Sequence, residues 1–217
     1  MLSTAWADSH QEATNSLRLA LLGSALTVVL TIPCVIVATA HRALNARWFV
    51  YPLVNLTLPG SLIALGVLGF ASRSLPTLLD SEAPLLFAYA CRYCGVAMLV
   101  MGINWARLPT TGEVAARLHG VSWWRRLLDV ELPPRLPALV AAMLVVMLLI
   151  AADLEISLIL VPPGTTTLGV RLYTLIHTAP DNLVSALAVD TLLLTFAMML
   201  VGSVIVAVLR RRTRRFA

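Results

Sequence analysis

Five long apolar stretches constrain this chain of 217 residues more than any other feature. They cover about residues 17–40, 48–71, 85–106, 137–152 and 182–209, and a proline-glycine pair at 59–60 interrupts the second. A helix that crosses a hydrocarbon core of ~30 Å needs about 20 apolar residues. Only 12% of the residues are charged, whereas soluble domains carry about 25%. The sequence therefore predicts an all-α, polytopic membrane helix bundle of about five transmembrane helices, forming a single domain over residues 1–217.

The placement of arginine predicts how this bundle is oriented. All 16 basic residues are arginine, and the chain contains no lysine. The connections 41–47 and 107–136 and the tail 210–215 carry two, five and five arginines, whereas the alternate connections carry only Arg73 and Arg171. Because arginine-rich connections stay in the cytoplasm, we expect the N-terminus outside and the C-terminus inside. The basic tail then serves as an anchor on anionic lipid, and no nucleic acid partner is predicted.

The connection 107–136 is the only long polar segment between apolar stretches, and its pattern predicts two short helices joined at a glycine. Thr110 and Glu113 have the spacing of a capping box, so the first helix is expected to start at residue 111. Gly120 tolerates a positive φ angle and is expected to end that helix. A rigid helix-turn-helix of this kind favours a docking element over a plain connector.

The second short helix of this connection has its own start and stop signals. Ser122 is a residue type that caps a helix N-terminus, so the second helix is expected to begin directly after it. Pro133 and the proline that follows it are expected to end that helix, because proline has no N–H to donate.

These same residues carry a family resemblance. The segment resembles the cytoplasmic EAA loop of ABC-importer permeases, the inner-membrane subunits of binding-protein-dependent transport systems. The pattern is E-A-A, three residues, G, nine residues and I-x-L-P, and Val130 stands at the isoleucine position. The family glutamate position falls on Val114, with Glu113 one residue early. Five residues are in register: Ala115, Ala116, Gly120, Leu132 and Pro133.

Further motifs extend the resemblance along nearly the whole chain. Residues 58–61, Arg92, Glu155 with Ser157, and residues 162–168 resemble the ferric-iron, thiamine and phosphonate branch of these permeases. In that branch two halves of six spans are often fused, and this chain resembles the second half without its first span. The resemblance implies a permease subunit in a bacterial inner membrane that forms a translocation path. Its expected partners are cytoplasmic ABC ATPase subunits, a second permease domain (identical or not), and a periplasmic or extracellular solute-binding protein.

The resemblance also implies roles for individual residues of the loop. Small side chains at 115 and 116 allow an ATPase to approach, Trp123 and Trp124 anchor in the partner or in lipid headgroups, and Arg117, Arg125 and Arg126 pair with its acids. The alternative is a solvated loop whose arginines only follow the orientation rule. The expected ATPase-coupling residues are Glu113, Ala115, Ala116, Gly120, Trp123, Arg125, Arg126, Leu132 and Pro133.

Charged residues inside the apolar stretches form a second candidate site. Because isolated charges at such depth are costly, Arg92 is expected to pair with Asp190 or with Asp153. The pair either holds helices together or places Arg92 on the path of an anionic substrate. Glu155 and Ser157 are candidates for contact with a binding protein or the substrate, and the alternative is a polar helix end.

No enzyme site is predicted in this chain. It has no phosphate-binding loop of the form G-x-x-x-x-G-K-[ST], so no cofactor is expected on this chain, and ATP and Mg²⁺ would bind the ATPase subunit. The four histidines show no metal spacing, and no metal site is predicted. Cys91 and Cys94 can be interpreted either as packing residues or as a metal or redox pair. Two rival functions remain open: an ATP-independent secondary transporter or channel, and a non-transporting fragment or membrane scaffold.

Overall fold

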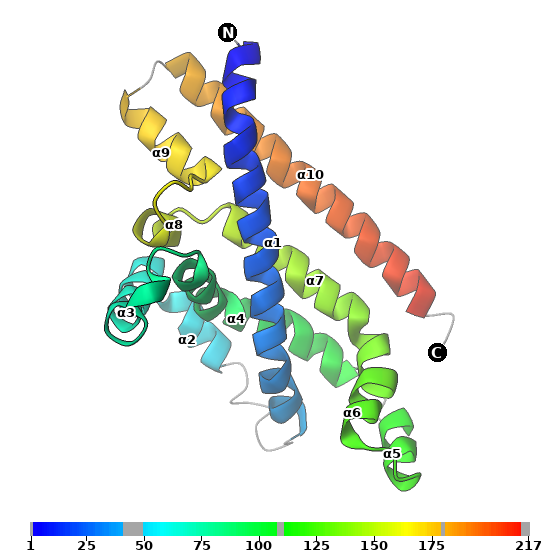
Figure 1. Ribbon diagram of the computed structural model, residues 1–217. Coiled ribbons are helices and arrows are strands. Elements are labelled where there is room, and N and C mark those ends of the chain that lie inside the picture. The colour runs from blue at the N-terminus through cyan, green and yellow to red at the C-terminus, as the bar shows by residue number, and fades with distance from the viewer. Residues whose placement is uncertain (1, 41–49, 108–110, 179–180, 214–217) are drawn as a thin grey trace.

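The computed structural model describes residues 2–40, 50–107, 111–178 and 181–213, and within these ranges it is a bundle of helices without a strand. The all-α class predicted from the sequence is confirmed. Figure 1 shows the elements in order. They are α1 (Leu2–Ala40), α2 (Val50–Thr57), α3 (Gly60–Ser74), the 3₁₀ turn η3 (Pro76–Leu78), α4 (Ala83–Arg107), α5 (Thr111–Leu118), α6 (Trp123–Arg125), the π-helical turn η4 (Arg126–Glu131), α7 (Leu132–Ala151), α8 (Glu155–Leu160), α9 (Leu168–Thr178) and α10 (Asp181–Thr213).

Four helical stretches of the described chain are long and apolar enough to cross a membrane. A fifth span is possible if α2 and α3 are counted as one, because the two pass the same test together although they are bent by 90° at their junction. About five spans, as predicted, therefore agree with the structure. The four unbroken stretches are Gln11–Thr39, Ala83–Ile103, Trp123–Ala151 and Thr191–Leu209.

The break between α2 and α3 lies at the proline-glycine pair that the sequence predicts to interrupt this span. Pro59 has an extended backbone with φ −61° and ψ 138°, and α3 starts at the next residue. Because proline has no N–H and disfavours a helical conformation in the residue before it, the helix stops and restarts in a new direction.

The core of the bundle lies where α1, α4 and α7 pack together. Leu19 and Val35 of α1, Tyr89 of α4 and Val146 of α7 are almost completely buried there. In contrast, α10 packs mainly on α7 and α9 and exposes large apolar side chains along its length, Leu192 among them. Exposed apolar side chains on a membrane helix are those that lipid covers.

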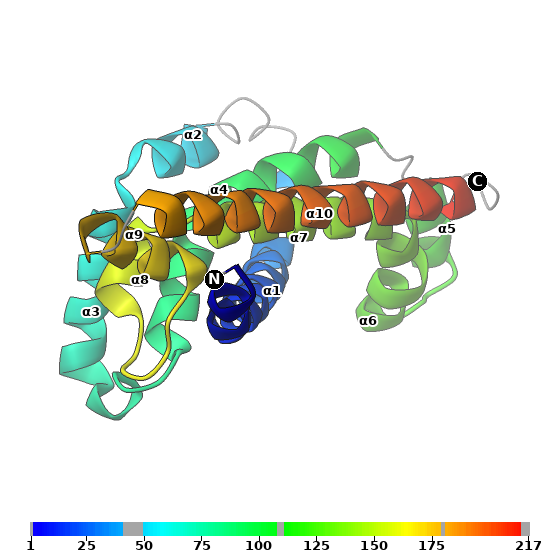
Figure 2. The same ribbon diagram turned by 90° about the horizontal axis from the view of Figure 1, so that it is seen from above.

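The two ends of the bundle differ in the elements they carry. Figure 1 shows α8, α9 and the start of α10 toward one end, and α5, α6 and the end of α10 toward the other. Seen from above in Figure 2, α10 runs between these two groups. The arginine-rich segment 107–136 and the end of α10 therefore share one side, as the predicted orientation requires.

Two helix boundaries differ from those predicted. The first helix begins at Leu2, well before residue 17, where the apolar stretch starts. The second helix of the 107–136 segment does not end at Pro133, because helical structure runs through η4 into α7. Without N–H groups at Pro133 and Pro134, the carbonyls of Asp129 and Val130 lose their α-helical donors. The wider π-helical turn lies at that point and deforms the helix without ending it.

Candidate functional site

The corner after α5 is built as the sequence predicts. Gly120 has φ +69°, a left-handed conformation that only glycine adopts without strain. Two backbone bonds close the corner: Val121 N–H donates to the Ala116 carbonyl at 3.0 Å, and Gly120 N–H donates to the Arg117 carbonyl at 3.1 Å. This pair of bonds is a Schellman motif, which satisfies carbonyls at the end of a helix. The corner therefore holds α5 at a defined angle to the chain that follows.

The other predicted features of this segment are met in part. α5 starts at Thr111 as predicted, and Ser122 occupies the position before α6, although its hydroxyl makes no capping bond. Ala115 is exposed, but Ala116 is buried within this chain, so only the first of the two faces outward. The side chain of Glu113 lies outside the described residues.

A buried ion pair joins the two ends of η4. Arg126 Nε lies 3.0 Å from Glu131 Oε1, and the two side chains are only 13% and 9% exposed. Arg126 thus has a partner in its own chain, which differs from the expectation that it pairs with an acid on an ATPase. Residues five apart face different sides of an α-helix, and the wider π-helical turn brings them together. Arg125 is exposed, and its pairing with a partner stays a prediction.

Arg135 links the same turn to the end of α4. Its NH1 donates to the Glu131 carbonyl at 2.8 Å, and its guanidinium lies 4.4 Å from the centre of the Trp105 ring. Both side chains are buried. Sequence reasoning counted Arg135 only as an orientation signal and passed over Glu131 and Trp105. The four-residue spacing from Glu131 to Arg135 predicts a side-chain pair, whereas the bond that Arg135 makes is to the Glu131 backbone carbonyl, which residue spacing does not indicate.

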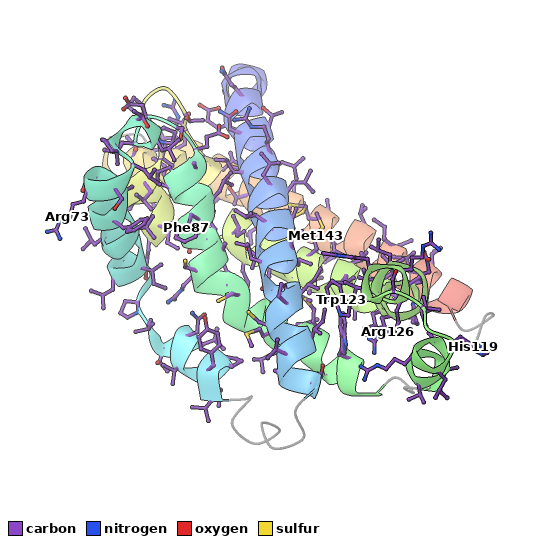
Figure 3. All side chains as sticks on the ribbon, turned by 60° about the horizontal axis from the view of Figure 1, so that its bottom comes forward. Arg73, Phe87, His119, Trp123, Arg126 and Met143 are labelled. Carbon is purple, nitrogen blue, oxygen red and sulfur yellow. The ribbon has the colours of Figure 1, made fainter. Side chains whose placement is uncertain are left out.

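The buried contacts of Arg126 with Glu131 and of Arg135 with Trp105 form what we call the root of the loop. The segment from α5 to η4 exposes apolar side chains. We call them the loop apolar residues: Val114, Leu118, Trp123, Trp124 and Leu128. Leu118 is 83% exposed, and the Trp123 and Trp124 rings meet edge to face at 4.5 Å. Figure 3 shows Trp123 and Arg126 on the segment after the corner and His119 at the tip of the loop. Exposed apolar side chains on a rigid polar segment are typical of a docking surface.

At the opposite end, Asp153 is bound by partners that differ from the predicted one. Tyr93 OH donates to Asp153 Oδ2 at 2.5 Å, and Ile156 N–H donates to Oδ1 at 2.9 Å. Both oxygens of the carboxylate are therefore engaged, and the described residues form no Arg92–Asp153 ion pair. The side chain of Asp190 lies outside the described residues, so the Arg92–Asp190 pair stays a prediction.

Ser157 is a buried structural residue in this conformation. It is 1% exposed, and its hydroxyl donates to the Asp153 carbonyl at 3.0 Å. Because that bond uses its only proton, the 2.7 Å contact with Tyr89 is a bond donated by the tyrosine hydroxyl. Ser157 thus connects α8 to α4 and is not exposed in this conformation, and its contact with a binding protein or the substrate stays a prediction.

Glu155 lies at the N-terminus of α3, where the second span is broken. Its Oε2 accepts a bond from Ser61 N–H at 3.2 Å. A carboxylate is favourable at this place because the free N–H groups of a helix start carry partial positive charge. Glu155 therefore connects α8 to the broken span. The sequence suggested either a contact with a binding protein or the substrate, or a polar helix end, and neither alternative includes this connection.

No family model and no curated protein matches the sequence. Among solved structures, a chain of the MetNI methionine ABC transporter in inward facing conformations matches with a TM-score of 0.68. The alignment covers 91% of this chain and 94% of that chain at 17% identity. The chain shares the fold of that transporter chain.

The corner and α5 lie outside the four candidate spans, whereas the Arg126–Glu131 pair and the exposed Trp123, Trp124 and Leu128 lie at the start of the stretch Trp123–Ala151. The ferric-iron, thiamine and phosphonate branch stays a prediction, as does the absence of one span relative to six-span permeases. The roles of Leu132 and Pro133 in coupling stay predictions too. In the structure they open α7, next to the ion pair.

The three cysteines of the chain line one apolar cavity of about 410 Å³ between α1, α2, α3 and α4. All three are free thiols. Cys94 Sγ lies 3.3 Å from Tyr51 OH and donates to the Cys91 carbonyl at 3.2 Å. Within the described residues no three metal-binding side chains are close enough to share an ion. These contacts favour the interpretation of Cys91 and Cys94 as packing residues.

Replacing Gly60 by alanine is expected to disturb the contact between α3 and Glu155. The added Cβ would lie 2.7 Å from Glu155 Oε2, so the carboxylate must move off the helix start. We expect the unfolding temperature of the chain in nanodiscs to fall by about 3–5 °C, given overpacking of at least about 1 kcal/mol. Gly69→Ala in the same helix is the matched control, because an added Cβ there meets nothing within 4 Å. Equal stability of the two variants would show that the bond from Ser61 N–H to Glu155 contributes little to the stability of the chain.

Proposed function

We propose that this chain is the permease subunit of an ATP-driven importer in a bacterial inner membrane. It forms one half of a translocation path, and a second permease domain supplies the other half. A cytoplasmic ATPase docks on the segment 113–133, and a solute-binding protein delivers the solute to the opposite end. The chain itself hydrolyses no ATP, and the nucleotide with its Mg²⁺ belongs to the ATPase.

One observation carries this proposal: the two-turn helix α5 is held rigidly outside the spans while its apolar side chains stay exposed. The Schellman corner at Gly120 sets its direction, and the buried Arg126–Glu131 pair fixes the turn on which it rests. Gly112 of α5 lies against this turn, since an added Cβ would be 3.4 Å from Val130 Cγ1. A flexible connector would require none of these contacts, whereas a helix that transmits force requires them all.

The fold supports the same proposal. A chain of a methionine ABC transporter shares it over 91% of this chain. The rival functions make different predictions. A secondary transporter would move its solute without an ATPase, and a non-transporting fragment or scaffold would retain no ATPase at all.

Replacing Leu118 by glutamate tests the docking directly. Leu118 is 83% exposed, so a charge there is compatible with the fold but not with burial in a partner's groove. We expect the retention of the partner ATPase to fall at least about tenfold, which corresponds to the loss of one apolar anchor of about 2 kcal/mol. The retained ATPase is quantified after affinity purification of the chain from detergent.

His119→Gln is the matched control, because His119 is the exposed neighbour at the tip of the same loop. It should leave ATPase retention unchanged. Solute uptake in vesicles that lack any ATPase would favour the secondary transporter. Failure of the unsubstituted chain to retain the ATPase would favour the scaffold.

A further inference from the structure

Arg92 is a charged residue near the middle of a membrane span. The span Ala83–Ile103 has 21 residues, and Arg92 is its tenth. At ~1.5 Å per residue it lies roughly 14 Å from one end of that helix segment and roughly 17 Å from the other. An arginine keeps its charge in any protein environment, so the guanidinium at this depth is a cation that water does not freely solvate.

One terminal nitrogen of this guanidinium is buried without an acceptor. Among the described residues, Arg92 NH1 is covered and has no hydrogen-bond partner. A buried N–H group of a charged side chain that lacks an acceptor is expensive, and a water, an ion or a ligand that supplies an acceptor relieves this cost. Arg92 is therefore unlike Arg126, whose Nε has a carboxylate partner at 3.0 Å.

None of the described acids forms an ion pair with Arg92. Asp153 has both oxygens engaged by Tyr93 and Ile156. Glu155 binds the start of α3 through Ser61. Glu82, at the outer end, pairs with Arg18. The described side chains therefore supply no acceptor to Arg92 NH1.

We propose that Arg92 binds an oxyanion group of the transported solute, a carboxylate or a phosphoryl group, at the middle of the membrane. This inference rests on the proposed role as a permease and adds the class of solute. A guanidinium presents paired N–H donors that match two oxygens of such a group, and its charge compensates that of the anion. Solute sites of membrane transporters generally lie near the bilayer midplane. The position of Arg92 meets that condition.

The test uses the full chain in nanodiscs of phosphatidylcholine, without ATPase or binding protein. Thermal unfolding is followed by tryptophan fluorescence in rising sodium acetate or methylphosphonate, with chloride holding the ionic strength constant. We expect a saturable rise of about 3 °C with at least one of the two anions, and none with uncharged acetamide. The anion that acts more strongly assigns the solute group.

Three variants test whether Arg92 causes the shift in unfolding temperature. Arg92→Gln should remove the shift, and Arg92→Lys should keep it at concentrations about tenfold higher, because the charge remains while the paired donors are lost. Arg73→Gln is the matched control. Arg73 is exposed on α3, and Figure 3 shows it projecting from the bundle. It should leave the shift unchanged.

The inference is overturned if Arg92→Gln responds like the unsubstituted chain, or if the unsubstituted chain shows no shift with either anion. A shift that appears only in Asp190→Asn overturns it too, because Asp190 would then be the partner of Arg92. A rise caused by phosphatidylglycerol in the nanodisc, and not by free anion, would assign the site to lipid. None of these outcomes depends on an ATPase. The proposed function is tested separately, by the retention of the ATPase on the Leu118→Glu variant.

Discussion

Replacing Gly120 by valine is expected to abolish ATP-driven transport while the chain remains folded in the membrane. The residue has φ +69°, which a β-branched side chain adopts only with strain of about 1–3 kcal/mol. An added Cβ meets nothing within 4 Å, so the substitution acts on the backbone of the corner and creates no clash. The corner should open and α5 should change direction. Uptake and ATPase retention are then expected to fall at least about tenfold.

Two further variants separate this effect from others. Gly120→Asn should retain most of the activity, because asparagine enters the left-handed region more readily than other side chains. Gly66→Val adds the same side chain where a Cβ also meets nothing within 4 Å, but in the helical backbone of α3. Normal solute uptake together with normal ATP hydrolysis in Gly120→Val would show that the corner has no role in coupling.

Replacing Glu131 by glutamine is expected to lower the unfolding temperature by about 10 °C. The substitution leaves the Arg126 guanidinium, 13% exposed, without its carboxylate. Removing one partner of a buried ion pair costs about 3–5 kcal/mol, and each kcal/mol lowers the midpoint of a chain of this size by about 2–4 °C. Thermal unfolding of the chain in nanodiscs measures the loss.

A double substitution tests whether the ion pair is the cause. Arg126→Met with Glu131→Met should recover most of the stability, because both charges leave the buried site together. Asp129→Asn, an exposed acid in the same turn, should change the midpoint little. If Glu131→Gln is as stable as Asp129→Asn, the pair does not stabilise the root of the loop.

The features that sequence reasoning predicted correctly depend on local chemistry. Span length follows from runs of apolar residues, and the break before α3 follows from the missing N–H of Pro59. The positive φ of Gly120 follows from its lack of a side chain. Each of these properties belongs to one residue or one continuous stretch, so the sequence pattern contains it directly.

The features that sequence reasoning missed depend on residues brought together by the fold. Asp153 was matched with Arg92 by charge, but the packing of α4 on α8 brings the hydroxyl of Tyr93 to it. Arg126 was assigned to a partner protein, because its pairing with Glu131 requires a π-helical turn. The same turn explains why Pro133 does not end the helix. A sequence pattern based on α-helical spacing does not predict this π-helical turn.

The π-helical turn has a consequence for the direction of α5. A π-helical turn amounts to one residue more than an α-helical turn would contain, and each residue of an α-helix rotates the chain by about 100°. The six residues from Arg126 to Glu131 therefore set the rotational phase between α7 and everything before it. A return to α-helical winding at this place would swing α5 roughly a quarter of a revolution around the axis of α7. The direction in which the docking surface faces thus depends on the one extra residue of the π-helical turn. The Arg126–Glu131 pair stabilises that turn.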